Sequence, residues 1–249
     1  MGDTISTISE LLPGTLGPIL NSQTTDELLG VLNDFTEKLG FSIVSYQMMP
    51  PIGFDNLGGP VAIYSKGYPD DIMSTYVTEK LYADDPLFKT AIRTGKVFWW
   101  WDVEKYHNLT PNQKKFMSVM KEANFSDGYA IPTFGPNGRN GFFGLGRGSL
   151  ERSEDSKEGK LMQLFCQALH LQYCLITQHL RQISDLSNKE HQVMTHVARG
   201  LSTNEIADTL GVSANTINTH LKHVYLKFDV NDRVSATLRF LAFGYIYDR

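Results

Sequence analysis

The chain has 249 residues, of which 41% are hydrophobic and 20% are charged, and its formal net charge is −4. This length suffices for one large domain or two smaller ones, and the composition excludes a disordered or fibrous protein. The negative charge argues against a protein that coats nucleic acid by charge alone. No apolar run approaches the roughly 20 residues that cross a bilayer, and the N-terminus lacks a basic segment followed by an apolar core. We therefore expect a cytoplasmic protein with no membrane partner.

The first part of the chain begins with helical and strand patterns in alternation. Residues 24–39 are amphipathic with a helical period, and Thr25 is placed to cap this helix. Residues 41–49 and 61–65 have the composition of strands, with a loop between them. Residues 69–85 then predict a helix whose first turn contains a proline and acidic side chains, which suit the positive end of the helix dipole.

The next elements complete one mixed domain. Residues 96–101 predict a strand, residues 110–125 a capped helix, and residues 128–149 a β-hairpin with a turn at "PNGRNG". A long helix is expected over residues 153–182. Helices before and after mostly antiparallel strands predict an α+β fold, an α-β-α sandwich over roughly residues 5–175.

Charge and pattern both change near the end of this helix. From residue 184 to residue 249 there are seven basic and seven acidic residues, so the acidic excess lies entirely earlier. The strands also disappear, and only short helices remain. We therefore expect a first domain over residues 1–176, a linker over 177–186 and an all-α domain of four helices over 187–249.

Each short helix of the second domain has its own start signal. Ser187 with Glu190, and Ser202 with Glu205, have the spacing of capping boxes, and Gly211 suits the left-handed residue of a tight turn. This arrangement predicts a helix–turn–helix. Seven residues fall at core spacing: Ile206, Ala207, Leu210, Val212, Ile217, Leu221 and Val224.

The third helix of this domain carries a polar stripe. Asn218 and Lys222 are four residues apart, so their side chains project together. In a major groove, Asn pairs with adenine and Lys donates to guanine. A polar stripe is usually only a solvated face, but no acidic residue occurs between Ser213 and Phe228. The stripe therefore favours contact with double-stranded DNA.

Residues 186–246, "LSNKEHQVMTHVARGLSTNEIADTLGVSANTINTHLKHVYLKFDVNDRVSATLRFLAFGYI", resemble the DNA-binding domain of LuxR-type transcription regulators. The markers of that family are Glu190, Gly200, "EIA" at 205–207, "LGVS" at 210–213, "T-I-x-x-H" at 216–220 and Ala236. The resemblance implies that the third helix enters the major groove and that the fourth pairs with its copy. It therefore implies a homodimer on a partly palindromic site, with RNA polymerase as a further partner.

The same resemblance implies which residues touch DNA. By position in the motif these are Thr216, Asn218, Thr219, His220, Lys222, Lys227 and Arg233. Asn218, Thr219 and Lys222 would face bases. His220, Lys227 and Arg233 are better placed for phosphates.

The N-terminal part lacks the rhythm of a phosphorelay receiver and a phosphate-binding "GxxxxGK[ST]" loop. Over about residues 24–175 it resembles the autoinducer-binding domain of quorum-sensing LuxR regulators. The family pattern is met by Tyr68-Pro69, Tyr76, Asp85-Pro86, Trp100 and Gly128. The tryptophan that the family has at position 72 is Ile72 in this chain.

The resemblance implies a site for an acyl-homoserine lactone. Asp85 would accept the amide N–H of this ligand, tyrosine hydroxyls would donate to its carbonyls, and Trp100 would pack on its head group. Ile72 cannot donate a hydrogen bond, and Gly144 stands where the family often has Ser or Thr. Each lost partner would cost about 1–3 kcal/mol, roughly 10- to 100-fold in affinity. The expected ligand-binding residues are Tyr68, Ile72, Tyr76, Asp85, Trp100, Gly128 and Gly144.

Three functional hypotheses follow. The first is a ligand-responsive dimeric transcription regulator that senses an acyl-homoserine lactone or another small amphiphile. The second is a ligand-independent DNA-binding regulator whose N-terminal domain is only a dimerisation scaffold. The third, an enzyme, is disfavoured because His107, His170 and His179 are scattered and no catalytic or metal-ligand spacing occurs. We therefore expect no catalytic residue, metal or cofactor other than the signal molecule.

Overall fold

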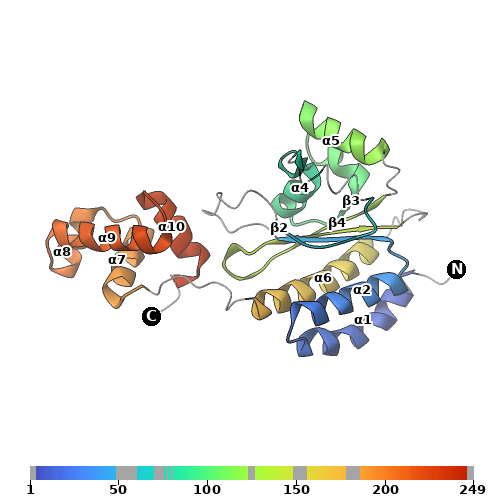
Figure 1. Ribbon diagram of the computed structural model, residues 1–249, viewed down its shortest axis with the longest axis horizontal. Helices are drawn as coiled ribbons and strands as arrows, with labels where there is room; N and C mark the ends of the chain where they lie inside the picture. Colours follow the sequence, from blue (N-terminus) through green and yellow to red (C-terminus); the bar gives the residue numbers. More distant parts are fainter. Residues whose placement is uncertain are drawn as a thin grey trace. The chain divides into compact units, whose positions relative to one another are not determined.

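The structure is a computed structural model that describes residues 4–48, 61–69, 76, 78–79, 81–122, 127–147, 156–177 and 186–245. The chain divides into two compact units, which are described separately (Figure 1). The first contains a sheet and the helices up to Thr177, and the second contains the four helices that follow. Within these ranges, no helix is long and apolar enough to cross a membrane.

The first unit is built on a five-stranded antiparallel sheet with the strand order β2-β1-β5-β4-β3. The strands are β1 (Ile43–Met48), β2 (Val61–Lys66), β3 (Phe98–Trp99), β4 (Gly128–Thr133) and β5 (Gly141–Gly146). Strands β4 and β5 pair from Gly128 opposite Gly146 to Thr133 opposite Gly141, as the predicted hairpin requires.

Helices cover both faces of this sheet (Figure 1). The helices on one face are α1 (Thr4–Asn21), α2 (Thr25–Lys38) and α6 (Ser156–Ile176). The elements on the other face are α4 (Pro86–Thr94), the 3₁₀ helix η3 (Trp100–Lys105) and α5 (Pro111–Glu122). The predicted α+β sandwich is therefore confirmed.

Some predicted elements have other bounds. Helix α2 begins after Thr24, whose side chain forms a capping box with Glu27, so Thr24 and not Thr25 is the cap. Helices α1 and α4 are additional to the predicted elements. Of the helix predicted over residues 69–85, residues 70–75, 77 and 80 lie outside the described residues, and its predicted end is wrong, because Leu81–Ala83 form the 3₁₀ helix η2 and Asp85 caps α4.

The strand predicted over residues 96–101 is only two residues long. Asp127 explains this because its Oδ1 accepts the backbone N–H groups of Gly128, at 2.9 Å, and Trp101, at 3.4 Å. The Asp127 carboxylate therefore accepts the N–H of Trp101 in place of a backbone carbonyl of the neighbouring strand, and β3 ends at Trp99. The chain turns at Trp100 into η3, and of the three successive tryptophans only Trp100 is fully buried.

Side chains alternate between the two layers along β1. Val44 and Tyr46 belong to the core beneath α1, α2 and α6, where the Tyr46 ring stacks on Phe143 at 4.2 Å between centroids. Ile43 belongs to the core beneath α4 and α5. Because strand side chains alternate, Ser45 shares the face of Ile43. The pleat of β1 therefore separates an apolar layer from a layer that also contains polar groups.

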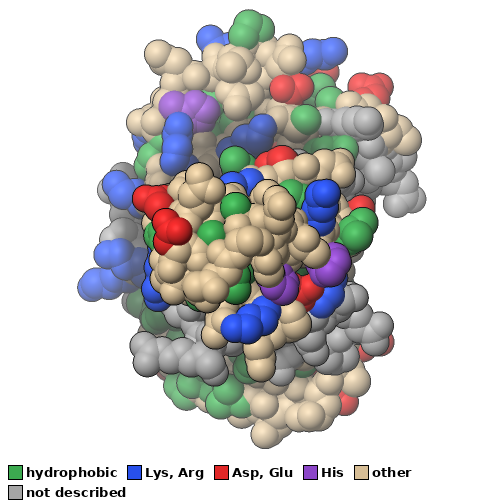
Figure 2. All heavy atoms as spheres, turned by 90° about the vertical axis from the view of Figure 1, so that its left-hand side faces the viewer, with side chains coloured by type: hydrophobic (Ala, Val, Ile, Leu, Met, Phe, Trp, Pro, Cys, Tyr) green, Lys and Arg blue, Asp and Glu red, His purple; other side chains and the backbone are tan. Residues whose placement is uncertain are grey.

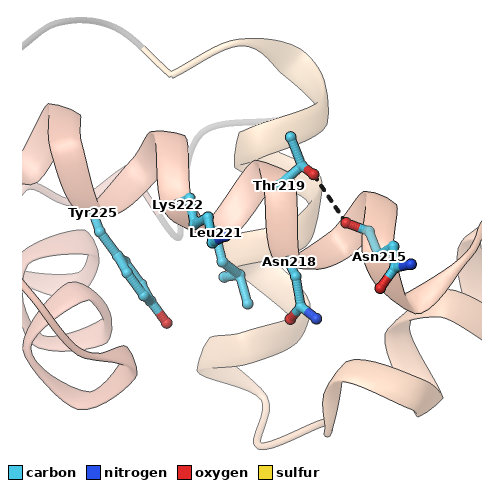
Figure 3. Close-up of a pocket in the computed structure, with 6 residues that line it drawn as sticks. All are labelled: Asn215, Asn218, Thr219, Leu221, Lys222 and Tyr225. Atoms are coloured by element: carbon cyan, nitrogen blue, oxygen red, sulfur yellow. Dashed lines mark hydrogen bonds between the residues drawn. The ribbon is translucent and has the colours of Figure 1, made fainter.

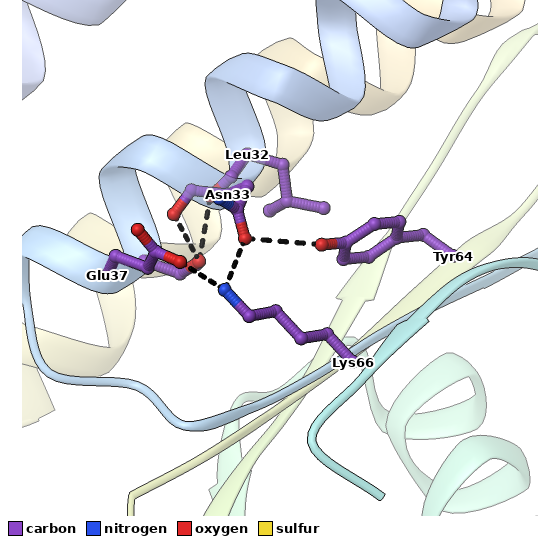
Figure 4. A network of polar contacts seen from close by, with 6 residues as sticks. Leu32, Asn33, Glu37, Tyr64 and Lys66 are labelled. Atoms are coloured by element: carbon purple, nitrogen blue, oxygen red, sulfur yellow. Dashed lines mark hydrogen bonds and ion pairs between the residues drawn. The ribbon is translucent and has the colours of Figure 1, made fainter.

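A polar cluster fastens the edge strand β2 to α2 (Figure 4). Lys66 donates to Asn33 Oδ1 at 2.6 Å and pairs with Glu37, and the Tyr64 hydroxyl donates to the same Asn33 oxygen at 3.2 Å. The hydrogen bond from Lys66 lowers the pKa of Glu37. Since this pair is exposed, we expect it to fix position more than to add stability.

The second unit contains α7 (Asn188–Ala198), α8 (Thr203–Leu210), α9 (Ala214–Phe228) and α10 (Arg233–Ala242). The two capping boxes and the left-handed Gly211 are confirmed. One predicted core residue is wrong: the side chain of Val212 is 41% exposed, because it follows Gly211 in the turn and lies on neither helix.

Candidate ligand site and nucleic-acid interface

Asp85 is the polar centre of the layer between the sheet and α4. It is the N-cap of α4, and its Oδ1 accepts the backbone N–H of Leu87 at 2.8 Å. Its Oδ2 accepts the hydroxyl of Tyr76 at 3.1 Å. Both carboxylate oxygens are thus held in place, although the side chain is buried.

Burial determines the protonation of this cluster. It raises the pKa of Asp85 to about 6, while the hydrogen bonds from Leu87 and Tyr76 act in the opposite direction. Burial also raises the pKa of Tyr68 to about 12 and, together with the neighbouring Asp85 charge, raises that of Tyr76 further. At neutral pH the site therefore offers tyrosine hydroxyl donors beside a largely ionised carboxylate.

The indole of Trp100 packs closely against two glycines, Gly128 and Gly146. A Cβ added to Gly128 would lie 2.7 Å from its Cζ2, and one added to Gly146 would lie 2.8 Å from its Cη2. Side chains at these positions would therefore displace the indole, which is only 2% exposed. Its Nε1 is buried, and no described residue accepts its hydrogen. Such a donor costs about 1–3 kcal/mol until an acceptor satisfies it.

Two further residues of this layer were missed by the sequence analysis as ligand-site candidates. Ser45 accepts the hydroxyl of Tyr68 at 3.2 Å, and Gln47 hydrogen-bonds Tyr76. The side-chain oxygen of Gln47, assigned as Oε1, is buried without a partner in the described part of the chain. The sequence does contain an indication of their place: side chains alternate along β1, so the polar residues Ser45 and Gln47 lie on the same face of the strand.

The structure brings most of the predicted ligand residues together. Tyr68 and Tyr76 pack against the same core cluster as Trp100, and both lie within electrostatic reach of Asp85. Gly144 adjoins Ser45, Tyr68 and Trp100, and Gly128 lies beneath the indole. Ile72 lies outside the described residues.

The exposed face of α9 is the candidate nucleic-acid interface (Figure 3). Asn215, Asn218, Thr219 and Lys222 are exposed and, with Leu221 and Tyr225, line a shallow hollow. The Thr219 hydroxyl donates to the Asn215 carbonyl at 3.0 Å, whereas the side chains of Asn218 and Lys222 extend from the helix.

The remaining predicted DNA contacts are arranged differently. Thr216 donates its backbone N–H to Ser213, the cap of α9, and His220 is half-buried. Lys227 pairs with Glu190 at 2.7 Å, and Arg233 donates to the carbonyl of Leu201. These two basic side chains therefore have partners within their own unit.

Charge on the face turned toward the viewer in Figure 2 is scattered, with Lys and Arg side chains among uncharged ones rather than in one continuous patch. Such a surface suits recognition through specific contacts better than coating by charge. Within the described ranges, no group of His, Cys, Asp or Glu side chains is arranged to hold a metal ion.

Comparison with known proteins identifies both units. A family described as "Autoinducer binding domain" matches residues 24–173, and one described as "Bacterial regulatory proteins, luxR family" matches residues 184–240. The transcriptional activator protein AnoR of Acinetobacter nosocomialis is 24% identical over 92% of this chain and 96% of its own. The quorum-sensing regulator RhlR of Pseudomonas aeruginosa is 25% identical over 94% of this chain and 95% of its own.

Among solved structures, Escherichia coli SdiA matches with a TM-score of 0.71 and 20% identity, over 98% of this chain and 99% of its own. A second SdiA structure, in complex with octanoyl-rac-glycerol, matches with the same TM-score and 21% identity, over 99% of this chain and 98% of its own. These likenesses confirm the fold. The two family matches show that the chain belongs to the LuxR-type quorum-sensing transcription regulators, which are not enzymes, and that it has an autoinducer-binding domain followed by a LuxR helix-turn-helix domain.

Proposed function

We propose that this chain is a cytoplasmic, dimeric regulator that binds an acyl-homoserine lactone or a related acyl amphiphile and reads a partly palindromic DNA site. The observation that carries the ligand part is the buried Asp85, whose two oxygens are held by Leu87 and Tyr76. A buried carboxylate needs donors. The amide N–H of an acyl-homoserine lactone supplies one more donor to it.

The other polar groups suit the oxygens of such a ligand. The Trp100 Nε1 is a buried donor without a described acceptor, and it lies in the same layer as Tyr68. A head-group carbonyl would satisfy this indole. We therefore propose that Trp100 supplies a donor that Ile72 cannot, in addition to packing on the head group.

A monoacylglycerol is the second candidate ligand. SdiA, which shares the fold, is solved with octanoyl-rac-glycerol. A glycerol hydroxyl would donate to Asp85 as an amide N–H does. Both candidates share an acyl carbonyl next to a hydrogen-bond donor.

Thermal unfolding of the full chain tests the ligand class. With a series of acyl-homoserine lactones and 1-octanoyl-rac-glycerol, we expect a saturable rise in Tm with at least one compound. Asp85→Asn should remove the rise, because the amide nitrogen of Asn replaces one acceptor oxygen with a donor. If the folded protein binds DNA but melts unchanged with every compound, the regulator is ligand-independent or senses another class of molecule.

We further propose that Asn218 and Lys222 of α9 read base edges in the major groove, within a homodimer that contacts RNA polymerase at its promoters. Their exposure and their spacing of four residues support this role. DNA selected from a random pool should contain inverted half-sites about 10 base pairs apart, centre to centre, or a multiple of that spacing.

Lys222→Ala should weaken binding and relax the preference at one base of each half-site, by about 1–3 kcal/mol. Lys189→Ala is the matched control because this lysine is exposed on α7. Equal loss of affinity in both variants would mean that Lys222 acts only through its charge.

A further inference from the structure

The side of α9 next to α7 carries two basic side chains around one carboxylate. Glu190 of α7 is buried, and its Oε2 accepts the Nζ of Lys227 and the backbone N–H of Ser187, each at 2.7 Å. Its other oxygen, Oε1, lies 3.7 Å from Nδ1 of His223. One carboxylate therefore holds the side chains of positions 223 and 227, which are one turn apart on α9.

The net charge of this cluster depends on His223. Burial acts to raise the pKa of Glu190, but the hydrogen bonds from Lys227 and Ser187 outweigh it and hold that pKa below its usual value. Glu190 is therefore ionised at neutral pH, and it cancels the charge of Lys227. A neutral His223 leaves the cluster without net charge, whereas a protonated His223 gives it one positive charge. A phosphate group would balance that charge.

The ring of His223 is accessible on its outer edge. Its side chain is 56% exposed, against 5% for that of Glu190. Because Nδ1 is turned toward Glu190, Nε2 lies on the opposite edge of the ring. Glu190 is the charged group that contacts the ring from α7, and Lys227 contacts the same carboxylate from α9. The acidic side chains of α8 and of the α10 cap form no ion pair with His223 among the described residues: Glu205, Asp208 and Asp232.

His223 also lies beside the residues proposed to read bases. It directly follows Lys222 and is therefore about 100° around the helix from it. The major groove is about 12 Å wide, close to the diameter of a helix with its side chains. A helix in this groove therefore directs one face at base edges and its two sides at the phosphate backbones. If Lys222 faces a base, His223 is on a side of α9 that faces phosphates.

We propose that His223 binds a DNA phosphate and takes up a proton from the solvent when it does so. The Nε2–H of the protonated ring donates to a phosphate oxygen. Glu190 is a positioning residue, since it orients the ring through Nδ1 and stabilises its charge. His223 thus supplies the positive charge that Glu190 cancels on Lys227. This inference rests on the proposed DNA binding, and it makes the affinity for DNA depend on pH.

Fluorescence anisotropy of the full chain tests the proposal, with a labelled duplex that carries the site selected from the random pool. Titrations run from about pH 6 to about pH 8, with a saturating amount of any compound that raises the Tm. We expect the affinity of wild type to rise roughly 5- to 10-fold per protomer as the pH falls over this range. His223→Gln should lack this rise, because its amide does not titrate.

The salt dependence supplies a second readout. A phosphate contact from a charged side chain releases one counterion from DNA. At about pH 6, the slope of log affinity against log salt concentration should therefore be steeper for wild type than for His223→Gln by about 0.9 per protomer. At about pH 8 the two slopes should agree. A purely structural role for His223 would change neither difference.

His196→Gln is the matched control, because this histidine is half-buried on α7 and should leave the pH profile of wild type unchanged. Glu190→Gln keeps the side-chain type of a capping box but removes the charge, so the rise in affinity should move to lower pH. Its Tm shows whether it folds. The comparison between variants cancels the titration of Asp85, which all of them retain.

The failures are distinguishable. If wild type binds the duplex and His223→Gln keeps the same pH profile and salt slopes, the role of His223 is overturned and the proposed function stands. The same holds if His220→Gln, and not His223→Gln, removes the pH dependence. An unchanged profile in folded Glu190→Gln would overturn the positioning role of Glu190. If wild type binds no DNA at any pH, the proposed function and the role of His223 fall together.

Discussion

Asp85 has two roles that depend on the same carboxylate. One oxygen caps α4 through the N–H of Leu87, and the other accepts the hydroxyl of Tyr76. The cap places the charge at the positive end of a helix, which favours its ionised form. Burial is the larger effect, however, and it raises the pKa to about 6. The site therefore holds a carboxylate whose pKa is higher than that of an ordinary Asp but still below neutral pH.

This raised pKa predicts how stability depends on pH. The ordinary pKa of Asp is 3.8, against about 6 in the fold. Between these values the folded state binds the proton more tightly, so the free energy of unfolding falls as pH rises from about 4 to about 6. The fall due to Asp85 is roughly 3 kcal/mol and is complete above that range.

Asp85→Asn should lack this dependence because its amide does not titrate, while its oxygen still caps α4. Without ligand, the variant should therefore melt above wild type at pH 7 and closer to it at pH 4. The measurement is denaturant unfolding of both proteins from pH 4 to pH 8. Parallel profiles would contradict a buried, titrating Asp85.

Single residues also show what the sequence could and could not predict. Tyr76, Asp85 and Trp100 were assigned to one site because they match a family pattern, and the structure brings them into one layer. Ser45 was not assigned, because its position next to its partner depends on the pairing of two distant strands. That partner, Gly144, is about a hundred residues away, and only the register of β1 and β5 brings the two together.

At the scale of elements, a helix was predicted correctly where the sequence carries a local signal for it. Three helices of the second unit were predicted because each begins with a cap that is readable within four residues, whereas the fourth was expected from the resemblance to the LuxR-type domain. Helix α1 was missed because it contains Pro13 and Pro18, which usually interrupt a helix. It forms because Ile8 and Ile19 are buried in the core shared with α6. In α1, the packing of these side chains outweighs the low helix propensity of proline. Such packing involves residues far apart in the sequence, so it cannot be predicted from a short segment.

The end of α9 depends on a distant arginine. Arg239 of α10 is buried and donates to the carbonyl of Phe228 and, at 3.1 Å, to that of Asp229. Asp229 adopts a left-handed conformation with φ of 51°. A positive charge at a helix C-terminus is favourable, and buried carbonyls need donors. Arg239 therefore joins α9 to α10.

Arg239→Met should destabilise the second unit by about 2–3 kcal/mol, because it leaves these carbonyls without a charged donor. Hydrogen exchange of the α9 amides measures this loss in the full chain. Arg199→Met is the control, since Arg199 is exposed at the end of α7 and should change stability by less than about 0.5 kcal/mol. Equal protection in both variants would refute the role of Arg239.

At the scale of the whole molecule, α6 has an exposed apolar face. Leu164, Leu171 and Leu175 are 62%, 44% and 54% exposed, and their spacings of seven and four place them on one side of the helix. Exposed leucines in such a row favour association between proteins. We propose that this face contributes to the homodimer.

A double substitution, Leu164→Glu with Leu175→Glu, should shift the full chain toward the monomer by placing four like charges in the dimer. Light scattering over a range of concentrations measures the shift, and affinity for palindromic DNA should fall with it. Lys160→Glu, an exposed change on α6, is the control. An unchanged mass would place the dimer contacts on other surfaces.

The pleat of β1 has a consequence for how such a sensor diverges. Ser45 and Gln47 face the ligand layer, while Val44 and Tyr46 face the core beneath α6. Under the proposed function, mutations at every second codon would alter which molecule is sensed, and those between them would alter whether the protein folds. A lineage can explore new signals along this strand without first risking its core.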